Sequence, residues 1–189
     1  IRVVPMDGKN WGKIEVNGAG GHLEAHFVEL SLGQFRIMAQ ATGVIEDSYL
    51  HDYFQGDNPI VFSEDAVTVD MRRCKISNYY EINLVRTLAT VEDCLLQFTT
   101  ADGLDCDNSP AGTTIRRCTF QYGRGTNIDA IDFGKVNFTG NGSIGLVEQC
   151  LVHDYSDKGV SVGEGAQQVT VHGNVFYNVG AGVAVKDNS

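Results

Sequence analysis

The stretch "TVEDCLL" at residues 90–96 contains the pattern that decides the fold. An apolar residue, Val91, is followed by two acidic residues, the small Cys94, and the apolar Leu96 two positions further on. Five other segments resemble it: "VIEDSYL" (44–50), "VDMRRCKI" (69–76), "TIRRCTF" (114–120), "LVEQCLV" (146–152) and "TVHGNVF" (170–176). Their small residues recur every 20 to 32 positions, at Ser48, Cys74, Cys94, Cys118, Cys150 and Asn174. The chain is therefore built from repeats.

A second series of segments alternates with the first. It comprises "PIVFSE" (59–64), "EINLVR" (81–86), "DGLDCD" (102–107), "DAIDFG" (129–134), "KGVSVG" (158–163) and "AGVAVK" (181–186). Apolar residues at every second position are typical of a strand with one buried face. The predicted inward pairs are Ile60/Phe62, Ile82/Leu84, Leu104/Cys106, Ile131/Phe133, Val160/Val162 and Val183/Val185.

Repeats of about 24 residues with two or three short strands each predict a parallel β-helix, an all-β solenoid of about seven coils. One repeat cannot bury its apolar face alone, so the coils must stack. Stacking places Cys74, Cys94, Cys118 and Cys150 above one another at a single corner. A free, buried cysteine behaves as a small apolar residue. We therefore expect a ladder of unpaired thiols, with no disulfide bond.

The composition limits the classes of partner that the chain could bind. The chain has 189 residues, 42% of them hydrophobic, and a net charge of -10. This charge excludes nucleic acid as a partner, because phosphates require Lys and Arg. No apolar run approaches the roughly 20 residues of a membrane span, so no membrane insertion is expected.

The chain is expected to form a single domain, residues 1–189, in which residues 1–43 are the opening coils and residues 44–189 the regular ones. It begins with Ile1 instead of Met and stops within a repeat. We therefore expect a fragment of a longer protein with other domains.

With these repeats, the chain resembles the right-handed parallel β-helix proteins of the pectin-lyase-like superfamily. The phrases "DKGVSVGEG" (157–165) and "GVAVKDNS" (182–189) are similar to those of bacterial surface or secreted β-helix proteins. The resemblance implies an extracellular or cell-surface location. It also implies a polysaccharide or cell-surface glycan as the partner, or a role as an adhesive or structural spacer.

Acidic residues gather in "TADGLDCDNS" (100–109) and "NIDAIDFG" (127–134). If Leu104 and Cys106 point inward, their neighbours on the strand point outward. Stacked strands lie about 4.8 Å apart, so one outward row should contain Asn83, Asp105, Asp132 and Ser161. A second row, at the entrance of the strands, should contain Asp102, Asp129 and Lys158.

Crowded carboxylates repel one another, and protonation, solvent screening or a bound cation would relieve the repulsion. Ca²⁺ prefers oxygen ligands. The sequence predicts that Ca²⁺ binds, at least weakly, to a patch of Asp102, Asp105, Asp107, Asp129 and Asp132.

Two enzyme families of this fold suggest catalytic residues. Polygalacturonases carry acids at positions that Asp102 and Asp129 match, but Ile128 replaces the first acid of their Asp-Asp pair and Lys158 replaces their histidine. An inverting hydrolase would then lack its general acid. Polysaccharide lyases use a Lys or Arg base beside bound Ca²⁺, which Lys158 resembles in kind. The candidate catalytic residues are therefore Lys158, Asp129 and Asp102. The alternative is that Lys158 pairs with Asp129 and only supports coil stacking.

The expected function is that of an extracellular, polysaccharide-interacting β-helix module. Its enzymatic form would be a lyase-like enzyme acting on acidic polysaccharide. A non-catalytic structural or adhesive spacer of a surface protein is the alternative.

Overall fold

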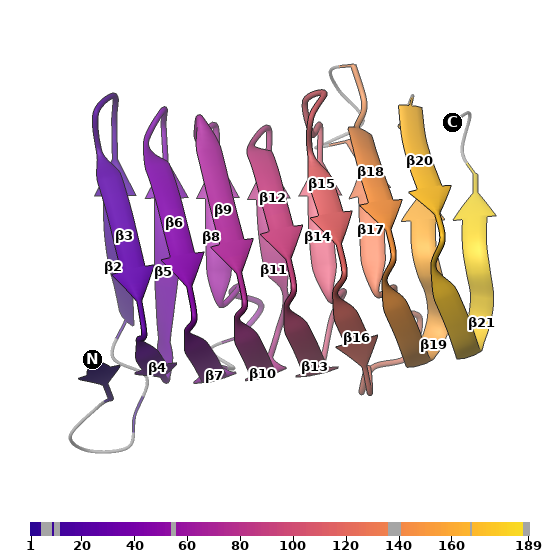
Figure 1. Cartoon of the computed structure of the whole chain (residues 1–189), viewed down its shortest axis with the longest axis horizontal. Helices are drawn as coiled ribbons and strands as arrows, with labels where there is room; N and C mark the ends of the chain where they lie inside the picture. The colour runs from indigo at the N-terminus through magenta and orange to yellow at the C-terminus, as the bar shows by residue number, and fades with distance from the viewer. Residues whose placement is uncertain (5–8, 10–11, 54–55, 136–140, 167, 187–189) are drawn as a thin grey trace.

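The computed structural model describes residues 1–4, 9, 12–53, 56–135, 141–166 and 168–186. Within these ranges every regular element is a β-strand, and no helix is present that is long and apolar enough to cross a membrane. The strands pair in parallel and stack into a solenoid of about seven turns (Figure 1). The prediction of a parallel β-helix is confirmed.

The strands form three faces. The first face contains β2 (Gly12–Asn17), β5 (Gly33–Met38), β8 (Val61–Glu64), β11 (Ile82–Val85), β14 (Leu104–Asp107), β17 (Ile131–Gly134) and the end of β19 (Leu151–Val162). The second face contains β3 (His22–His26), β6 (Thr42–Glu46), β9 (Thr68–Arg72), β12 (Leu88–Glu92), β15 (Thr114–Arg116), β18 (Ile144–Glu148) and β20 (Gln168–His172). The third face contains β1 (Arg2–Val3), β4 (Glu29–Ser31), β7 (Tyr49–Tyr53), β10 (Lys75–Tyr79), β13 (Leu95–Thr99), β16 (Thr119–Gln121) and the start of β19. Strand β21 (Val175–Val185) pairs along both parts of β19.

The core is a set of rows of buried apolar side chains that run along the axis. On the second face, one row is 0% exposed at each of Ile45, Met71, Val91, Ile115 and Val147. On the first face, the predicted inward pairs from Ile82/Leu84 to Val160/Val162 are buried as expected. Val183 and Val185 continue their rows in register, but they are 43% and 66% exposed because they lie on the last described strand.

One predicted inward pair, Ile60/Phe62, is wrong in its register. Val61 and Ser63 pair with the inward Ile82 and Leu84, so Phe62 points outward beside Asn83. Ile60 is buried, but it precedes the strand. The run from Pro59 to Phe62 is apolar throughout and gives no alternation from which to choose the face. Ser63 fits inside because its hydroxyl hydrogen-bonds to that of Thr87, at 2.8 Å.

The cysteine ladder is confirmed. Cys74, Cys94, Cys118 and Cys150 are each at most 3% exposed, and all five cysteines are free. The amide of Cys74 donates to the sulfur of Cys94 at 3.4 Å. Asn174 extends the ladder by accepting from the amide of Cys150 at 2.7 Å. The small residues thus connect neighbouring coils at one corner.

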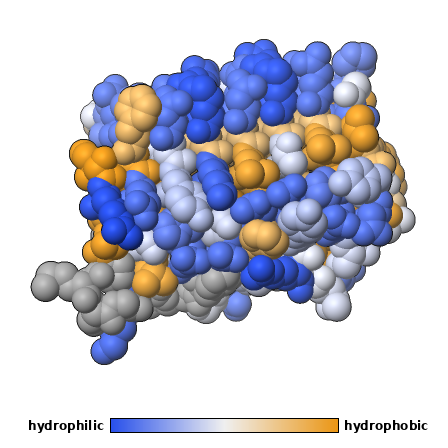
Figure 2. All heavy atoms as spheres, turned by 60° about the horizontal axis from the view of Figure 1, so that its bottom comes forward, coloured by the Kyte–Doolittle hydropathy of each residue, from blue (hydrophilic) through white to orange (hydrophobic). Residues whose placement is uncertain are grey.

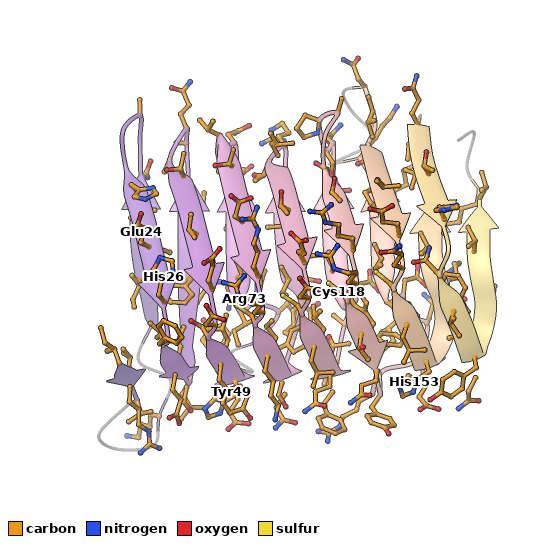
Figure 3. The ribbon with its side chains drawn as sticks, in the orientation of Figure 1. Glu24, His26, Tyr49, Arg73, Cys118 and His153 are labelled. Atoms are coloured by element: carbon orange, nitrogen blue, oxygen red, sulfur yellow. The ribbon has the colours of Figure 1, made fainter. Side chains whose placement is uncertain are left out.

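A charge ladder lies beside the cysteines on the second face. Acidic and basic residues alternate from coil to coil in the paired row Glu46, Arg72, Glu92, Arg116 and Glu148. The next residues repeat this alternation at the corner, where Arg73 Nε donates to Asp47 at 2.7 Å and Arg117 Nε to Asp93 at 2.8 Å. Figure 3 labels Arg73 and Cys118 in these neighbouring rows. In Figure 2 a hydrophilic row runs along the molecule beside a band of apolar side chains.

The corner residues of the charge ladder have an unusual backbone. Asp47, Arg73, Asp93, Arg117 and Gln149 have φ between 50° and 56°. This left-handed region is uncommon for residues other than glycine. It turns the chain sharply between the second and third faces while the side chains remain outside, where Asp47 pairs with Arg73 and Asp93 with Arg117.

Candidate functional site

The outward row of the first face carries the polar side chains that could contact a ligand. Strand pairing places in this row Arg36, Phe62, Asn83, Asp105, Asp132 and Ser161. Ser161 is 0% exposed, so it cannot contact a ligand. Asp105 and Asp132 are partners on adjacent strands, and both are half-buried. The expected row, and the prediction that these two acids are outward-pointing neighbours on adjacent coils, are therefore confirmed. They are less exposed than predicted, because each is half-buried.

The entrance row is a hydrogen-bonded stack. Asp102 accepts from the amide of Asp129 at 2.7 Å, and Asp129 accepts from the amide of Lys158 at 3.0 Å. The Lys158 ammonium lies 3.3 Å from Asp129 Oδ1 and also contacts Asp157. Asp129 is only 6% exposed. These contacts join successive coils, as the coil-stacking alternative requires.

The protonation of Lys158 follows from its partners. Burial disfavours the charged amine, but the hydrogen bond that Lys158 donates to Asp157 and the charge of Asp129 outweigh it and hold the pKa of Lys158 above its usual value. A base in a lyase must be unprotonated to accept the sugar proton. The geometry of Lys158 thus opposes the role of base.

The acids of the first face have raised pKa values. Burial, followed by the charge of Asp102, raises the pKa of Glu81 to about 7. Burial likewise raises the pKa of Asp102 to about 6, and burial with the charge of Glu164 raises that of Asp107 to about 6. Burial and neighbouring acids also raise the pKa of Asp105 and Asp132. These five carboxyls are therefore desolvated and mutually repelling.

The acids lie in rows and do not converge on one point. In the described ranges no three His, Cys, Asp or Glu side chains are grouped so that they could hold a metal ion together. A preformed Ca²⁺ cage of six to eight oxygens does not fit this arrangement. Calcium binding at the predicted patch stays a prediction.

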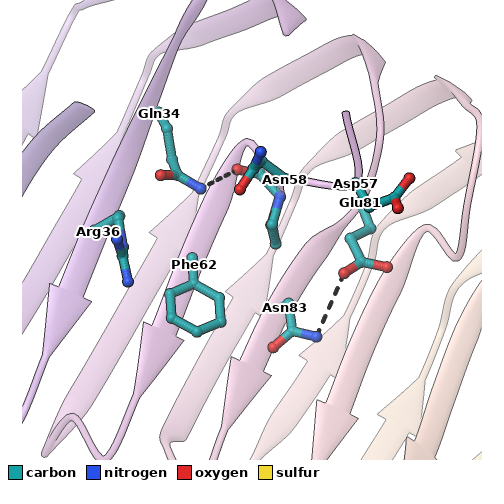
Figure 4. Close-up of a pocket in the computed structure, with 8 residues that line it drawn as sticks. Gln34, Arg36, Asp57, Asn58, Phe62, Glu81 and Asn83 are labelled. Atoms are coloured by element: carbon teal, nitrogen blue, oxygen red, sulfur yellow. Dashed lines mark hydrogen bonds between the residues drawn. The ribbon is translucent and has the colours of Figure 1, made fainter. Parts of the chain in front are cut away.

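A pocket of about 290 Å³ opens at the N-terminal side of the acid row (Figure 4). It is lined by Gln34, Arg36, Asp57, Asn58, Pro59, Phe62, Glu81 and Asn83. The guanidinium carbon of Arg36 lies 5.0 Å from the centre of the Phe62 ring. On the other side of this ring, Asn83 donates to Asp105 at 2.7 Å.

Two buried atoms in the pocket wall have no hydrogen-bond partner among the residues that the structure describes. They are Arg36 Nε, which can only donate, and Asn83 Oδ1, which can only accept. Buried polar atoms are nearly always paired, so these two atoms indicate where a ligand would complete the wall. Of the residues that line the pocket, sequence reasoning placed only Asn83 on the outward row. Phe62 was assigned inward, and nothing in the repeat distinguished Arg36 or Glu81.

A family model agrees with this fold. The family model described as "Right handed beta helix region" matches residues 59–189, more than half of the chain. The chain therefore belongs to the right-handed β-helix family. Comparison with curated proteins and with solved structures gives no significant match.

Proposed function

We propose that this β-helix binds a polysaccharide along its first face, with the Phe62 pocket as the anchor. The observation that carries the proposal is the half-buried Phe62 ring, flanked in one row by Arg36 and Asn83. Ligand pockets combine apolar surface with a few well-placed polar groups. A sugar ring has apolar C–H faces for an aromatic ring and hydroxyls that both donate and accept. The pocket provides a partner for each.

The side chains support polysaccharide binding without cleavage better than they support an enzymatic function. The ion pairs of Lys158 with Asp129 and Asp157 favour its protonated form, which opposes lyase chemistry on an acidic polysaccharide. A hydrolase needs a general acid and a second carboxylate on either side of the scissile bond. Asp129 instead accepts the amide and ammonium hydrogens of Lys158. We therefore assign Asp102, Asp129 and Lys158 to coil stacking.

The proposed partner also suggests a location. We propose that the protein is located outside the cell or on the bacterial cell surface, where polysaccharides are exposed. Further domains of the parent chain would place the solenoid there.

Affinity electrophoresis in gels that contain neutral, acidic or amino-sugar polysaccharides tests the proposal. We expect at least one polysaccharide to retard the protein, and Phe62→Ala to weaken the interaction at least tenfold, as for a hot-spot aromatic. Tyr122→Ala removes a 43% exposed ring from the third face and is the matched control. Equal retardation of both variants, or no retardation by any polysaccharide, would refute the proposal.

A structural or adhesive spacer is the second candidate. The specific observation in its favour is that the cysteine and charge ladders link successive coils, which makes a rigid rod. A correctly folded protein that binds none of the three polysaccharide classes would support this function in place of the first.

A further inference from the structure

The acids of the second face and those in the middle of the first face differ in their ion-pair partners. On the second face Glu92 accepts from Arg116 at 2.9 Å, and Asp93 accepts from Arg117 at 2.8 Å. On the first face, Glu15 pairs with Lys13 and Arg36, and Glu64 pairs with Arg86. The remaining acids considered on this face are Glu81, Asp102, Asp105, Asp107 and Asp132. In the described part of the chain, no Lys or Arg nitrogen lies within 4.0 Å of any of these five carboxylates. Lys158, Arg86 and Lys186 compensate Asp102, Asp107 and Asp132 only from a distance. The middle of the first face therefore presents acids without direct ion pairs beside the pocket.

The two sides of the pocket wall lack different hydrogen-bond partners: one side lacks a donor and the other lacks an acceptor. On the side of Asn83, the buried Oδ1 has no donor among the described residues, and the carboxylate of Glu81 lies 3.5 Å from the Asn83 amide nitrogen. On the side of Arg36, Glu15 lies 3.6 Å from Nη1, but the buried Nε has no acceptor among the described residues. A ring stacked on Phe62 must then offer donors, preferably charged, toward Asn83 and an acceptor toward Arg36 (Figure 4).

We infer, resting on the polysaccharide binding proposed above, that the ligand is an amino-sugar polymer with free amino groups. Its ammonium groups face Asn83, Glu81 and the row of carboxylates, and a ring hydroxyl faces Arg36. An ammonium group brings three donors and a positive charge. An N-acetylated unit has lost this charge, and a uronate unit adds a carboxylate to a face that already repels its own acids.

The regular spacing of the coils allows a polymer to contact several carboxylates. Asp105 and Asp132 follow Asn83 at successive strands, and strands lie about 4.8 Å apart. A chain that runs along the axis from the pocket meets these carboxylates one after another. Charge complementarity of this kind sets specificity by rejecting the wrong partner as well as by attracting the right one.

Isothermal titration near neutral pH with three oligosaccharides of equal length tests the inference: free-amine glucosamine oligomers, their N-acetylated counterparts and oligogalacturonate. We expect the free-amine oligomer to bind at least tenfold more tightly than the acetylated one, and oligogalacturonate not to bind. Asp105→Asn/Asp132→Asn should remove this preference. Glu24→Gln/Asp70→Asn, which removes two acids from the second face, should keep it and so controls for net charge.

The possible results distinguish failure of the amino-sugar inference from failure of the polysaccharide-binding proposal on which it rests. Equal affinity for the free-amine and acetylated oligomers, tighter binding of oligogalacturonate, or a preference that survives in Asp105→Asn/Asp132→Asn overturns the amino-sugar inference. In each case, if Phe62→Ala abolishes the binding that is observed, the proposal of polysaccharide binding at the Phe62 pocket is still supported. If no oligosaccharide binds and no polysaccharide retards the protein, both fall. Circular dichroism of each variant establishes that it is folded.

Discussion

Asp105 and Asp132 are direct partners on adjacent parallel strands, and in the described ranges neither has an ion-pair partner. Both carboxyls are half-buried, and burial is the first cause of their raised pKa values. Two like charges at strand spacing in a partly desolvated place oppose folding. The pair therefore costs stability, which suggests that it is retained for binding.

Asp105→Asn/Asp132→Asn should stabilise the fold at pH 8. Asparagine keeps the shape and removes the repulsion, so we expect a gain of about 1 kcal/mol in the free energy of unfolding. This corresponds to roughly 2–4 °C in Tm for a domain of this size. Scanning calorimetry measures the shift, and a lower Tm in the variant would contradict the proposed repulsion.

Stability should fall as pH rises from about 4 to about 7. The folded-state pKa values of Glu81, Asp102 and Asp107 are about 7, 6 and 6, above their ordinary values of 4.5, 3.8 and 3.8. In this window the folded state binds more protons than the unfolded state, so raising pH favours unfolding. Several carboxyls act in the opposite sense, because hydrogen bonds lower their pKa values: Glu15, Glu24, Asp47, Asp65 and Asp154. The stability that they contribute is lost only as pH falls below the ordinary values of 4.5 for Glu and 3.8 for Asp.

Urea denaturation at pH 5, 6, 7 and 8 measures this dependence. A free energy of unfolding that is constant or rises over this interval would show that the acids of the first face are solvated. The slope should flatten in Asp105→Asn/Asp132→Asn.

Glu92→Gln should destabilise the protein by about 2 kcal/mol. Glu92 is 8% exposed and accepts from both Arg116 and Arg117. Removing one member of a buried ion pair is strongly unfavourable, and partial exposure of both arginines reduces the effect here. Glu148→Gln is the control, because Glu148 is in the same row and forms no ion pair in the described part of the chain. Equal effects of the two variants, measured by urea denaturation, would argue against the charge ladder.

Thiol titration should find five free cysteines in denaturant and no rapid reaction in the native protein. The four ladder cysteines are at most 3% exposed, and burial raises the pKa of the Cys106 thiol, so it stays in its unreactive form. A count of three or one in denaturant would reveal disulfide bonds.

Millimolar Ca²⁺ should raise Tm by a few degrees at most. The carboxylates attract a divalent cation, but they do not converge into a cage, so binding is expected to be weak and the gain small. Melting curves in CaCl₂, in chelator, and in NaCl of equal ionic strength separate binding from screening. The same shift in NaCl, or an undiminished shift in Asp105→Asn/Asp132→Asn, would contradict a calcium site at the patch.

The repeat predicted most of the fold because stacking makes equivalent positions coincide. Cys94 in "TVEDCLL" was enough to align the ladder, and alternation placed Asp105 and Asp132 outward. The pocket was missed for physical reasons: "PIVF" is apolar at every position, so it does not specify the face of Phe62, and Arg36 and Glu81 meet there only in three dimensions. The charge ladder had a visible signal, since "ED", "RR", "ED" and "RR" precede successive small residues.

The charge ladder constrains how such a chain can lengthen or shorten. Because Glu46, Arg72, Glu92 and Arg116 alternate from coil to coil, deleting the single coil that contains Glu92 would bring Arg72 and Arg116 together. Deleting two consecutive coils would restore acid beside base. The electrostatic period of this solenoid is thus two coils although its structural period is one, so duplications and deletions in pairs preserve the alternation.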